Sequence, residues 1–228
     1  DTGMAWRGGG SAAEQSIAPF LRARGIRHVN QLVISHADLD HSGGVEVIRR
    51  ELGVGLVLAG EHQELIASSR CRAGQHWVSA GVRFEVLHPA RSSSAEGNAA
   101  SCVVRVSAGS YGMLLTGDIE AGSEYRLIRN GAPLASDIVV VPHHGSLTSS
   151  TVPFTDSVRP AYAVVSAGFG NRWGFPKPRV VERWRAVGAK VLNTASSGAV
   201  YFRVCSRTGV VAVGRERQLR HRFWHARG

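Results

Sequence analysis

The segment 31–44, QLVISHADLDHSGG, contains the most informative residues of this chain. Its apolar beginning predicts a buried strand, which runs directly into a turn rich in histidine and aspartate. Imidazole and carboxylate groups spaced this closely suit a divalent metal such as zinc or manganese. The alternative is a solvated polar loop, but so many possible ligands within one turn favour a metal site. The expected ligands are His36, Asp38, Asp40 and His41.

A further candidate ligand, Asp118, follows the strand predicted at 111–116. In layered α/β folds, sites assemble at the carboxyl ends of strands, and a carboxylate in that position can bridge two metals. The alternative is that Asp118 caps the helix predicted after it. Together with the first motif, its position favours a role in the metal site.

Two histidines follow another apolar strand, predicted at 138–141, in the sequence PHHGS. The residue types alone do not decide which histidine binds metal; we favour His143. His144 and Ser146 are then expected to contact a phosphate group or water. The alternative is a loop histidine that is satisfied by backbone hydrogen bonds.

The order of strand-like and helix-like segments predicts an α/β or α+β fold. We expect one domain over residues 1–214, followed by a basic tail over 215–228 that contains Phe223 and Trp224. The predicted helices are 16–24, 45–51, 119–129 and 178–187. The predicted strands are 31–35, 55–59, 82–87, 102–107, 111–116, 138–141, 162–166, 190–193, 199–204 and 210–213.

The chain of 228 residues is strongly basic, with 27 Lys and Arg against 17 Asp and Glu and a net charge of +10. Nearly all of the cations are arginines, whose planar guanidinium groups suit phosphate oxygens. Such a charge favours a polyanionic partner, above all nucleic acid. The alternative is biased codon usage combined with a basic tail. No apolar run approaches the roughly 18–20 residues that span a bilayer.

The three cysteines are Cys71, Cys102 and Cys205. Their number is odd and no CxxC pair occurs, so neither a disulfide framework nor a zinc ribbon is expected. Cys102 and Cys205 lie in apolar runs and are predicted to be buried filler residues.

Taken together, the motifs resemble those of the metallo-β-lactamase fold. They are Asp1-Thr2-Gly3, HADLDH at 36–41, LLTGD at 114–118 and PHHGS at 142–146. The HxDxDH form, with PHHGSLTSS at 142–150 and NRWGFP at 171–176, resembles the C-terminal domain of the ComEC family of DNA-internalisation competence proteins. This likeness extends from Asp1 to about Val204.

The resemblance implies an αββα sandwich with a metal site at one edge. It also implies that Asp1 braces the metal loop from behind. In that fold this aspartate normally ends a strand, so the N-terminal strands of the sandwich are expected to be missing here. The parent protein would lie in the bacterial inner membrane, with this domain as a soluble portion on the periplasmic side, next to the membrane channel portion.

Two departures from the family pattern affect the expected site. Lactamase-like hydrolases normally have a histidine where Asn98 or Ser101 stands, and ComEC relatives often have one at Phe175. Asn98, Ser101 and Asn171 are therefore expected to support the ligands from behind, or to be turn and cap residues. The other histidines are expected to be surface or structural residues: His28, His62, His76, His88, His221 and His225.

The favoured function is a metal-dependent nuclease or phosphodiesterase that degrades one DNA strand during uptake. One or two divalent ions, zinc or manganese, would be the only cofactor, and Asp40 or Asp38 would orient or deprotonate the attacking water. DNA would be held through its backbone, without sequence preference. The alternatives are a small-ester hydrolase of the same fold and a non-catalytic DNA-binding module.

Overall fold

The computed structural model of the chain describes residues 1–61, 69–205 and 207–220. Within these ranges a small parallel sheet has the order β1-β2-β3. The apolar run that ends at Ile34 forms β1 (His28–Ile34), which pairs in parallel with β2 (Gly53–Ala59). The short β3 (Ser69–Arg70) adds to the other side of β2.

A larger mixed sheet has the order β10-β9-β8-β7-β6-β5-β4. Its first four strands along the chain form an antiparallel meander, and from β7 onward the strands are parallel. Parallel neighbours need crossover connections, and helices provide them here. The bounds are β4 His76–Ser79, β5 Val82–His88, β6 Val103–Ala108, β7 Tyr111–Leu115, β8 Ile138–Val140, β9 Tyr162–Val165 and β10 Lys190–Asn193.

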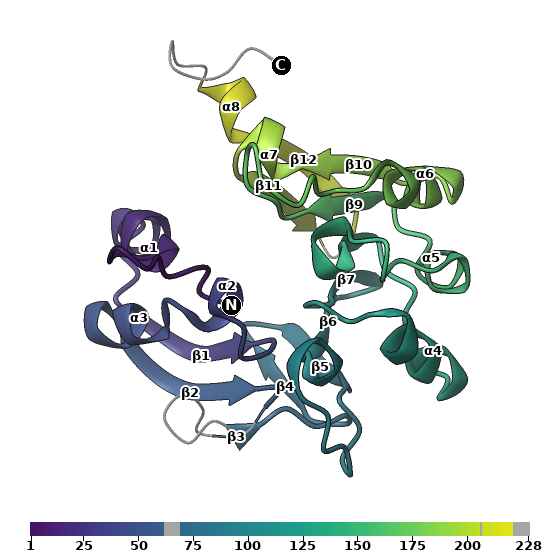
Figure 1. Cartoon of the computed structure of the whole chain (residues 1–228), viewed down its shortest axis with the longest axis horizontal. Coiled ribbons are helices and arrows are strands. Elements are labelled where there is room, and N and C mark those ends of the chain that lie inside the picture. Colours follow the sequence, from purple (N-terminus) through teal and green to yellow (C-terminus); the bar gives the residue numbers. More distant parts are fainter. Residues whose placement is uncertain (62–68, 206, 221–228) are drawn as a thin grey trace.

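The helices cover the outer faces of the two sheets (Figure 1). On the small sheet lie η1 (Ala13–Ile17), which continues as α1 (Ala18–Ala23), and α3 (Val45–Glu51). On the large sheet lie α4 (Ala121–Arg129), α5 (Val152–Val158) and α6 (Pro178–Ala186). The expected αββα order of layers is therefore confirmed.

Three layers of apolar side chains hold the sandwich together. Ile48 and Leu52 pack between the first helices and the small sheet, and Phe154 and Trp184 pack beneath the helices of the large sheet. The middle layer joins the two sheets, with Leu58 from β2 against Val104 from β6. Because side chains alternate along a strand, each sheet can supply two of these layers.

The remaining elements are short and lie mostly at the ends of strands. A hairpin of β11 (Val200–Cys205) and β12 (Gly209–Arg215) forms a separate two-stranded sheet, followed by α8 (Glu216–Leu219). The other short turns are α2 (Leu39–Ser42), η2 (Gly97–Ala100), η3 (Pro142–Gly145) and α7 (Thr194–Ser197). None of the helices in the described ranges has the length and hydropathy needed to cross a bilayer.

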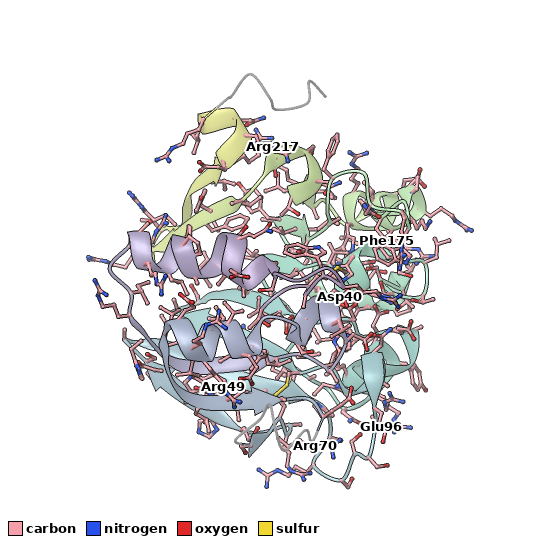
Figure 2. The ribbon with its side chains drawn as sticks, turned by 60° about the vertical axis from the view of Figure 1, so that its left-hand side comes forward. Asp40, Arg49, Arg70, Glu96, Phe175 and Arg217 are labelled. Carbon is pink, nitrogen blue, oxygen red and sulfur yellow. A yellow bond between two sulfur atoms is a disulfide. The ribbon has the colours of Figure 1, made fainter. Side chains whose placement is uncertain are left out.

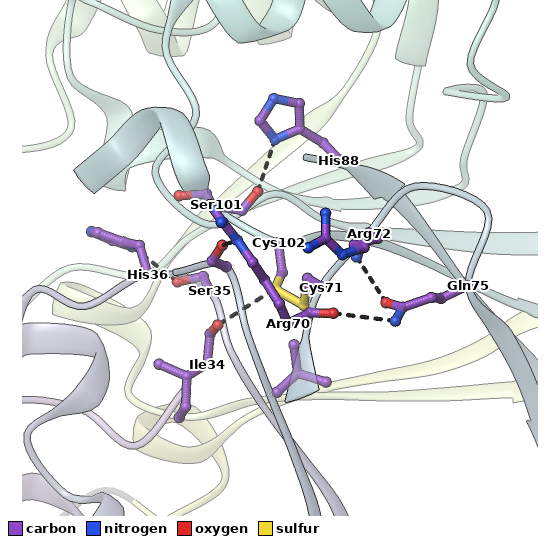
Figure 3. The surroundings of a disulfide bond; sticks show 12 residues. Ile34, Ser35, His36, Arg70, Cys71, Arg72, Gln75, His88, Ser101 and Cys102 are labelled. Carbon is purple, nitrogen blue, oxygen red and sulfur yellow. Dashed lines mark hydrogen bonds between the residues drawn. A yellow bond between two sulfur atoms is a disulfide. The ribbon is translucent and has the colours of Figure 1, made fainter. Parts of the chain in front are cut away.

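Cys102 is buried as predicted, but the prediction that the cysteines form no disulfide was wrong, as was the predicted burial of Cys205. Cys71 and Cys102 form a disulfide, with their Cα atoms 5.9 Å apart (Figure 3). Both are buried in the layer between the two sheets, although 31 positions separate them in sequence. Spacing along the chain could not reveal a pairing that only the packing of the two sheets creates. Cys205 is free and only half-buried on β11.

Candidate metal centre

The candidate centre lies where three strands end. β1 leads into the HADLDH turn, β7 leads to Asp118, and β8 leads to the two adjacent histidines. These turns meet in space: His41 Nε2 lies 3.3 Å from Asp118 Oδ2 and 3.3 Å from His144 Nε2. Segments separated by about half of the chain therefore contribute to one cluster of imidazoles and carboxylates.

Local backbone geometry allows this approach. Gly117 has φ +54°, and a Cβ atom there would lie 2.7 Å from the Cβ of Ser35 and 2.9 Å from that of Ser101. Only glycine fits so close to both neighbours. His143 and His144 have φ values of 48° and 53°, a region that non-glycine residues seldom occupy and that is often found at functional sites.

Asp1 and Ser35 support the histidines of the first motif from behind. Asp1 Oδ1 accepts a hydrogen bond from the Ser35 amide at 2.6 Å, and Asp1 Oδ2 lies 3.0 Å from His41 Nδ1. The Ser35 hydroxyl donates to Asp1 Oδ2 at 3.0 Å. A carboxylate behind a histidine in this way is the usual support of a metal-binding imidazole.

These contacts determine which nitrogen of each ring carries the proton. Ser35 uses its only hydroxyl proton on Asp1, so it accepts from the Nδ1 atoms of His36 and His41, both at 3.1 Å. His144 Nδ1 lies 2.8 Å from the carbonyl oxygen of Ser166, which can only accept. In the neutral form of each of the three rings, Nε2 is therefore the nitrogen that keeps the lone pair.

The lone pairs of these Nε2 atoms face carboxylates and one another. Asp118 Oδ2 lies 3.4 Å from His144 Nε2, and Asp40 Oδ2 lies 3.5 Å from the same atom. His36 Nε2 is buried and has no hydrogen-bond partner among the described residues, although Asp38 Oδ2 lies 3.4 Å away. So many electron pairs and negative charges in one volume favour a positive charge there, supplied either by a proton or by a metal ion.

The titration behaviour of the cluster reflects the same preference. Burial by itself would lower the pKa of His144, but hydrogen bonds to Asp118 and Asp40 raise it to about 10. Without a metal, His144 Nε2 therefore carries a proton that faces these carboxylates, and a bound cation would take the place of that proton. Burial also opposes the ionisation of Asp118, yet the hydrogen bonds from His144 and His41 hold its pKa well below the usual range. The hydrogen bond from His144 lowers the pKa of Asp40. The site thus stabilises anionic carboxylates that attract a cation.

A divalent cation fits this donor set. Two groups have ligand atoms within 4.8 Å of one another: His36 with His41 and Asp118, and Asp40 with His41 and His144. The Nε2 atom of His36 is buried and has no hydrogen-bond partner among the described residues, which is expected of a nitrogen that binds a metal ion. Imidazole and carboxylate donors in this mixture suit zinc or manganese.

The geometry favours His144 over His143 as the ligand. His143 Nε2 is 3.9 Å from Asp118, and its Nδ1 lies 3.1 Å from Thr148 Oγ1 and 3.3 Å from Glu120. His143 is thus directed to the edge of the cluster, whereas His144 Nε2 lies within it. The sequence could not distinguish the two, because the left-handed backbone at both positions decides where each ring points.

The other expected residues have different positions. Ser101 is fully buried and accepts a hydrogen bond from the Asp118 amide at 3.0 Å, so it positions that carboxylate. Asn171 holds the backbone of Phe175 through two hydrogen bonds of 2.8 Å.

Ser146, which was expected to contact phosphate or water, does not reach the cluster: its Oγ pairs with Thr148 Oγ1 at 3.1 Å. Asn98 lies half-buried in η2, and its backbone carbonyl accepts a hydrogen bond from the Ser101 amide at 3.2 Å.

Among the other histidines, His88 is structural: it is buried and its Nδ1 lies 3.0 Å from the Ser101 carbonyl. His28 and His76 are exposed, and His62, His221 and His225 lie outside the described residues.

A buried carboxylate supports the loop that follows His144, which sequence reasoning missed. Glu124 accepts hydrogen bonds from the amides of Ser150 and Thr151, and its pKa is raised by burial against the effect of those bonds. Trp184 Nε1 donates to the Ser150 hydroxyl at 3.1 Å. A glutamate within a helix carries no sequence signal for such a role, because its partners lie far along the chain.

The chain belongs to the metallo-β-lactamase superfamily, since the model of that family matches residues 1–168. Among solved structures, it is similar in fold to the metallo-beta-lactamase fold protein YhfI from Bacillus subtilis. That similarity has a TM-score of 0.50 and 12% identity, and it covers 81% of this chain and 80% of YhfI.

Two curated relatives are bacterial proteins with roles in their printed names. The chain is 40% identical to "Competence protein ComA" of Neisseria gonorrhoeae over 203 residues, which are 89% of this chain and 29% of that protein. It is 39% identical to "Recombination protein 2" of Haemophilus influenzae over 210 residues, which are 88% of this chain and 25% of that protein. The chain therefore spans between a quarter and three tenths of the length of these relatives.

Proposed function

We propose that this chain is the metal-dependent hydrolase domain of a DNA-uptake protein, and that it cleaves DNA phosphodiester bonds. The observation that carries this proposal is the convergence of three Nε2 lone pairs with Asp40 and Asp118, each imidazole being fixed from behind. The likeness to a competence protein and the net charge of +10 support DNA as the substrate.

The proposed metal ligands are His36, His41, His144, Asp118 and Asp40, with Asp38 beside His36. When bound, a divalent cation supplies Lewis acidity, which stabilises negative charge on a phosphate group and makes water more acidic. Asp1, Ser35 and Ser166 keep the ligand nitrogens aimed inward, and Ser101 does the same for Asp118.

The more exposed groups of the site would act on the substrate and the water. The side chain of Asp38 is 60% exposed and that of Asp40 is 37% exposed, so either carboxylate can orient a water molecule or accept its proton. His143, held by Glu120 and Thr148 through Nδ1, can direct Nε2 toward a phosphate oxygen or the leaving oxygen. Ser146 is bonded to Thr148 and takes no direct part in this proposal.

The disulfide supports the proposed location on the periplasmic side of the inner membrane. Disulfides persist in oxidising compartments such as the bacterial periplasm and are rare in the cytosol. The Cys71–Cys102 bond also lies close to the candidate centre, because Cys102 directly follows Ser101, whose hydroxyl positions Asp118. In this proposal the rest of the parent protein forms the membrane channel beside the domain.

A cleavage assay tests the proposed activity. The purified chain is incubated with single-stranded and plasmid DNA in manganese, in zinc and in chelator, with elemental analysis of the same preparation. We expect bound metal, cleavage that chelator abolishes, and no cleavage by Asp118→Ala. Asp156→Ala, at an exposed ion pair with Arg159, is the matched control. Cleavage that persists in chelator would contradict the proposal, and rescue by zinc alone would argue against manganese.

The second candidate function is a DNA-binding module without catalytic activity. It is favoured by one observation: the position where related hydrolases have a further histidine is occupied here by Asn98 or Ser101, and Ser101 Oγ is engaged with the Asp118 amide. If the parent chain binds DNA but cleaves none with manganese or zinc, and Asp40→Ala binds DNA equally tightly, this second function is supported instead.

A further inference from the structure

Beside the candidate metal centre, the loop between β9 and α6 presents aromatic rings to solvent. Trp173 and Phe175 are stacked, with centroids 6.3 Å apart and planes inclined by 11°. The ring of Phe175 continues this arrangement to His144, at 6.5 Å and 24°. We call Trp173 and Phe175 the aromatic shelf. It borders the cluster directly, because His144 Nε2 lies 3.5 Å from Asp40, and Figure 2 labels Phe175 and Asp40 on the same part of the molecule.

The shelf is accessible and carries positive charge. Trp173 is 46% exposed, far more than a tryptophan that serves only to fill the core. The guanidinium of Arg172 lies 4.4 Å from the centre of the Trp173 ring, and the ammonium of Lys177 lies 5.5 Å from that of Phe175. Flat rings combined with cations are suited to a ligand that has flat π faces and negative charges.

The shelf is also held in place before any ligand binds. The side-chain amide of Asn171 accepts from the Phe175 amide and donates to the Phe175 carbonyl, both at 2.8 Å. Pro176 packs against Gly145, where a Cβ atom would lie 2.6 Å from the proline Cβ, and the Lys177 amide donates to the Gly145 carbonyl at 2.9 Å. The loop is thus fastened to the residue after His144, so little ordering is needed on binding.

We propose that the aromatic shelf binds unpaired bases of a single-stranded nucleic acid and thereby guides its backbone into the neighbouring centre. This inference rests on the proposed function and specifies its substrate class. Stacking on aromatic side chains is open only to unpaired bases, since bases in a duplex are already stacked on one another. Arg172 would face a phosphate that connects the stacked bases, while the Lys177 ammonium, which donates to the Trp173 carbonyl at 2.6 Å, adds positive charge beside it.

The test compares two ligands that differ only in their bases. Binding of a fluorescent oligothymidylate of about 12 nucleotides is measured by anisotropy, beside an abasic strand of equal length. Chelator is present throughout, so neither metal loading nor cleavage affects the result. For the parent chain we expect the oligothymidylate to bind about ten-fold more tightly than the abasic strand.

Substitutions of Trp173 then show whether the preference for a strand with bases depends on the aromatic shelf. Trp173→Ala should bring the affinity ratio of the two strands close to one, while Trp173→Phe keeps most of it and the binding of a duplex stays unchanged. Tyr125→Ala removes an aromatic residue on α4 that is 64% exposed and serves as the matched control. Thermal unfolding confirms that each variant is folded.

Several outcomes would overturn the inference. One is an affinity ratio of the oligothymidylate to the abasic strand near one in the parent chain, and another is an unchanged ratio in Trp173→Ala. A third is equally weakened binding of the oligothymidylate, the abasic strand and the duplex by Trp173→Ala, which would indicate a general role of Trp173 in packing or charge. Failure of the proposed function gives a different result: the ratio is preserved, but the cleavage assay shows no chelator-sensitive activity.

Discussion

Ser35 donates its single hydroxyl proton to Asp1, and this one hydrogen bond sets the tautomers of two histidines. The result is that His36 and His41 both keep Nε2 free to face the carboxylates. His144 reaches the same state independently, through the carbonyl of Ser166. At the scale of single residues, the centre is therefore prepared for a cation by hydrogen bonds on the far side of each ring.

Substituting the two adjacent histidines separately distinguishes their roles. His144→Ala removes a nitrogen that lies within 3.5 Å of three potential ligand atoms, so we expect bound metal to fall sharply. His143→Ala should leave the metal content near that of the parent chain, because the ring lies 3.9 Å from Asp118 at the edge of the cluster. Elemental analysis after dialysis measures both. The reverse order of metal contents would restore His143 as the ligand.

Asp1→Asn tests the support behind His41. The substitution keeps the shape of the side chain but replaces an anionic acceptor at 3.0 Å from His41 Nδ1. Loss of such a partner typically lowers metal affinity roughly 10- to 100-fold. Competition with a chromophoric chelator gives the affinity, and Asp156→Asn at the surface is the control. An affinity equal to that of the parent chain would show that Asp1 has no part in holding the metal.

The sequence predicts the cluster better than it predicts what supports it. HADLDH and Asp118 are recognisable because several ligand types occur at strand ends, and the structure brings them together. Ser35 and Ser166 carry no comparable signal, since a serine after a strand is common and a backbone carbonyl is present in every residue. Which of two neighbouring histidines points inward depends on backbone angles that composition does not reveal.

At the scale of elements, close contacts between strand ends bring the motifs together. Gly117 lies between Ser35 and Ser101, the residues that orient the histidines and Asp118. A hydrogen bond joins these two regions directly, because the Cys102 amide donates to the Ser35 carbonyl at 2.8 Å. The disulfide adds a covalent link from Cys102 to Cys71, which follows β3 of the small sheet (Figure 3). The turns are therefore held at fixed distances by packing as well as by a covalent bond.

Gly117→Ala should disturb this contact. The added Cβ would overlap Ser35 and Ser101 at a positive φ, so we expect a loss of roughly 1–3 kcal/mol in the free energy of unfolding, together with weaker metal binding. Gly122→Ala on α4, where the nearest heavy atom is 3.9 Å away, should be neutral or stabilising. Urea unfolding of both variants makes the comparison. Equal stability of the two would contradict the proposed close packing.

Removing the disulfide tests its contribution to the sandwich. The variant with both Cys71→Ala and Cys102→Ala should lose about 3 kcal/mol of unfolding free energy, because the closed loop spans 31 positions. Cys205→Ala, at a free half-buried thiol, serves as the control. The measurement is urea unfolding with and without reductant. If reductant leaves the parent chain unchanged although the thiols are shown to be reduced, the bond has no stabilising role.

Over the whole molecule, a basic chain surrounds a centre rich in carboxylates. The net charge of +10 attracts polyanions, whereas Asp40 and Asp118 repel a phosphate group that approaches the site without a cation. Under the proposed function, this contrast would let the domain collect DNA over its surface and act on it only when metal is bound.

The layered fold was predictable from the alternation of apolar segments and the resemblance of the motifs. Helix 45–51 and strand 190–193 have the expected bounds. The helix α5 and the short strands β3 and β4 were not predicted, because they are brief and lack a strong apolar period. The disulfide was missed for a related reason, since it depends on how two sheets pack and not on any local pattern.

The central claim is that these distant residues hold one or more divalent cations. The most direct measurement is an anomalous difference map from crystals of the chain grown with manganese. We predict a peak bonded to His41 Nε2 and Asp118, with His144 Nε2 as a further ligand. A metal-loaded crystal in which the peak lies elsewhere, or in which these side chains separate, would contradict the account.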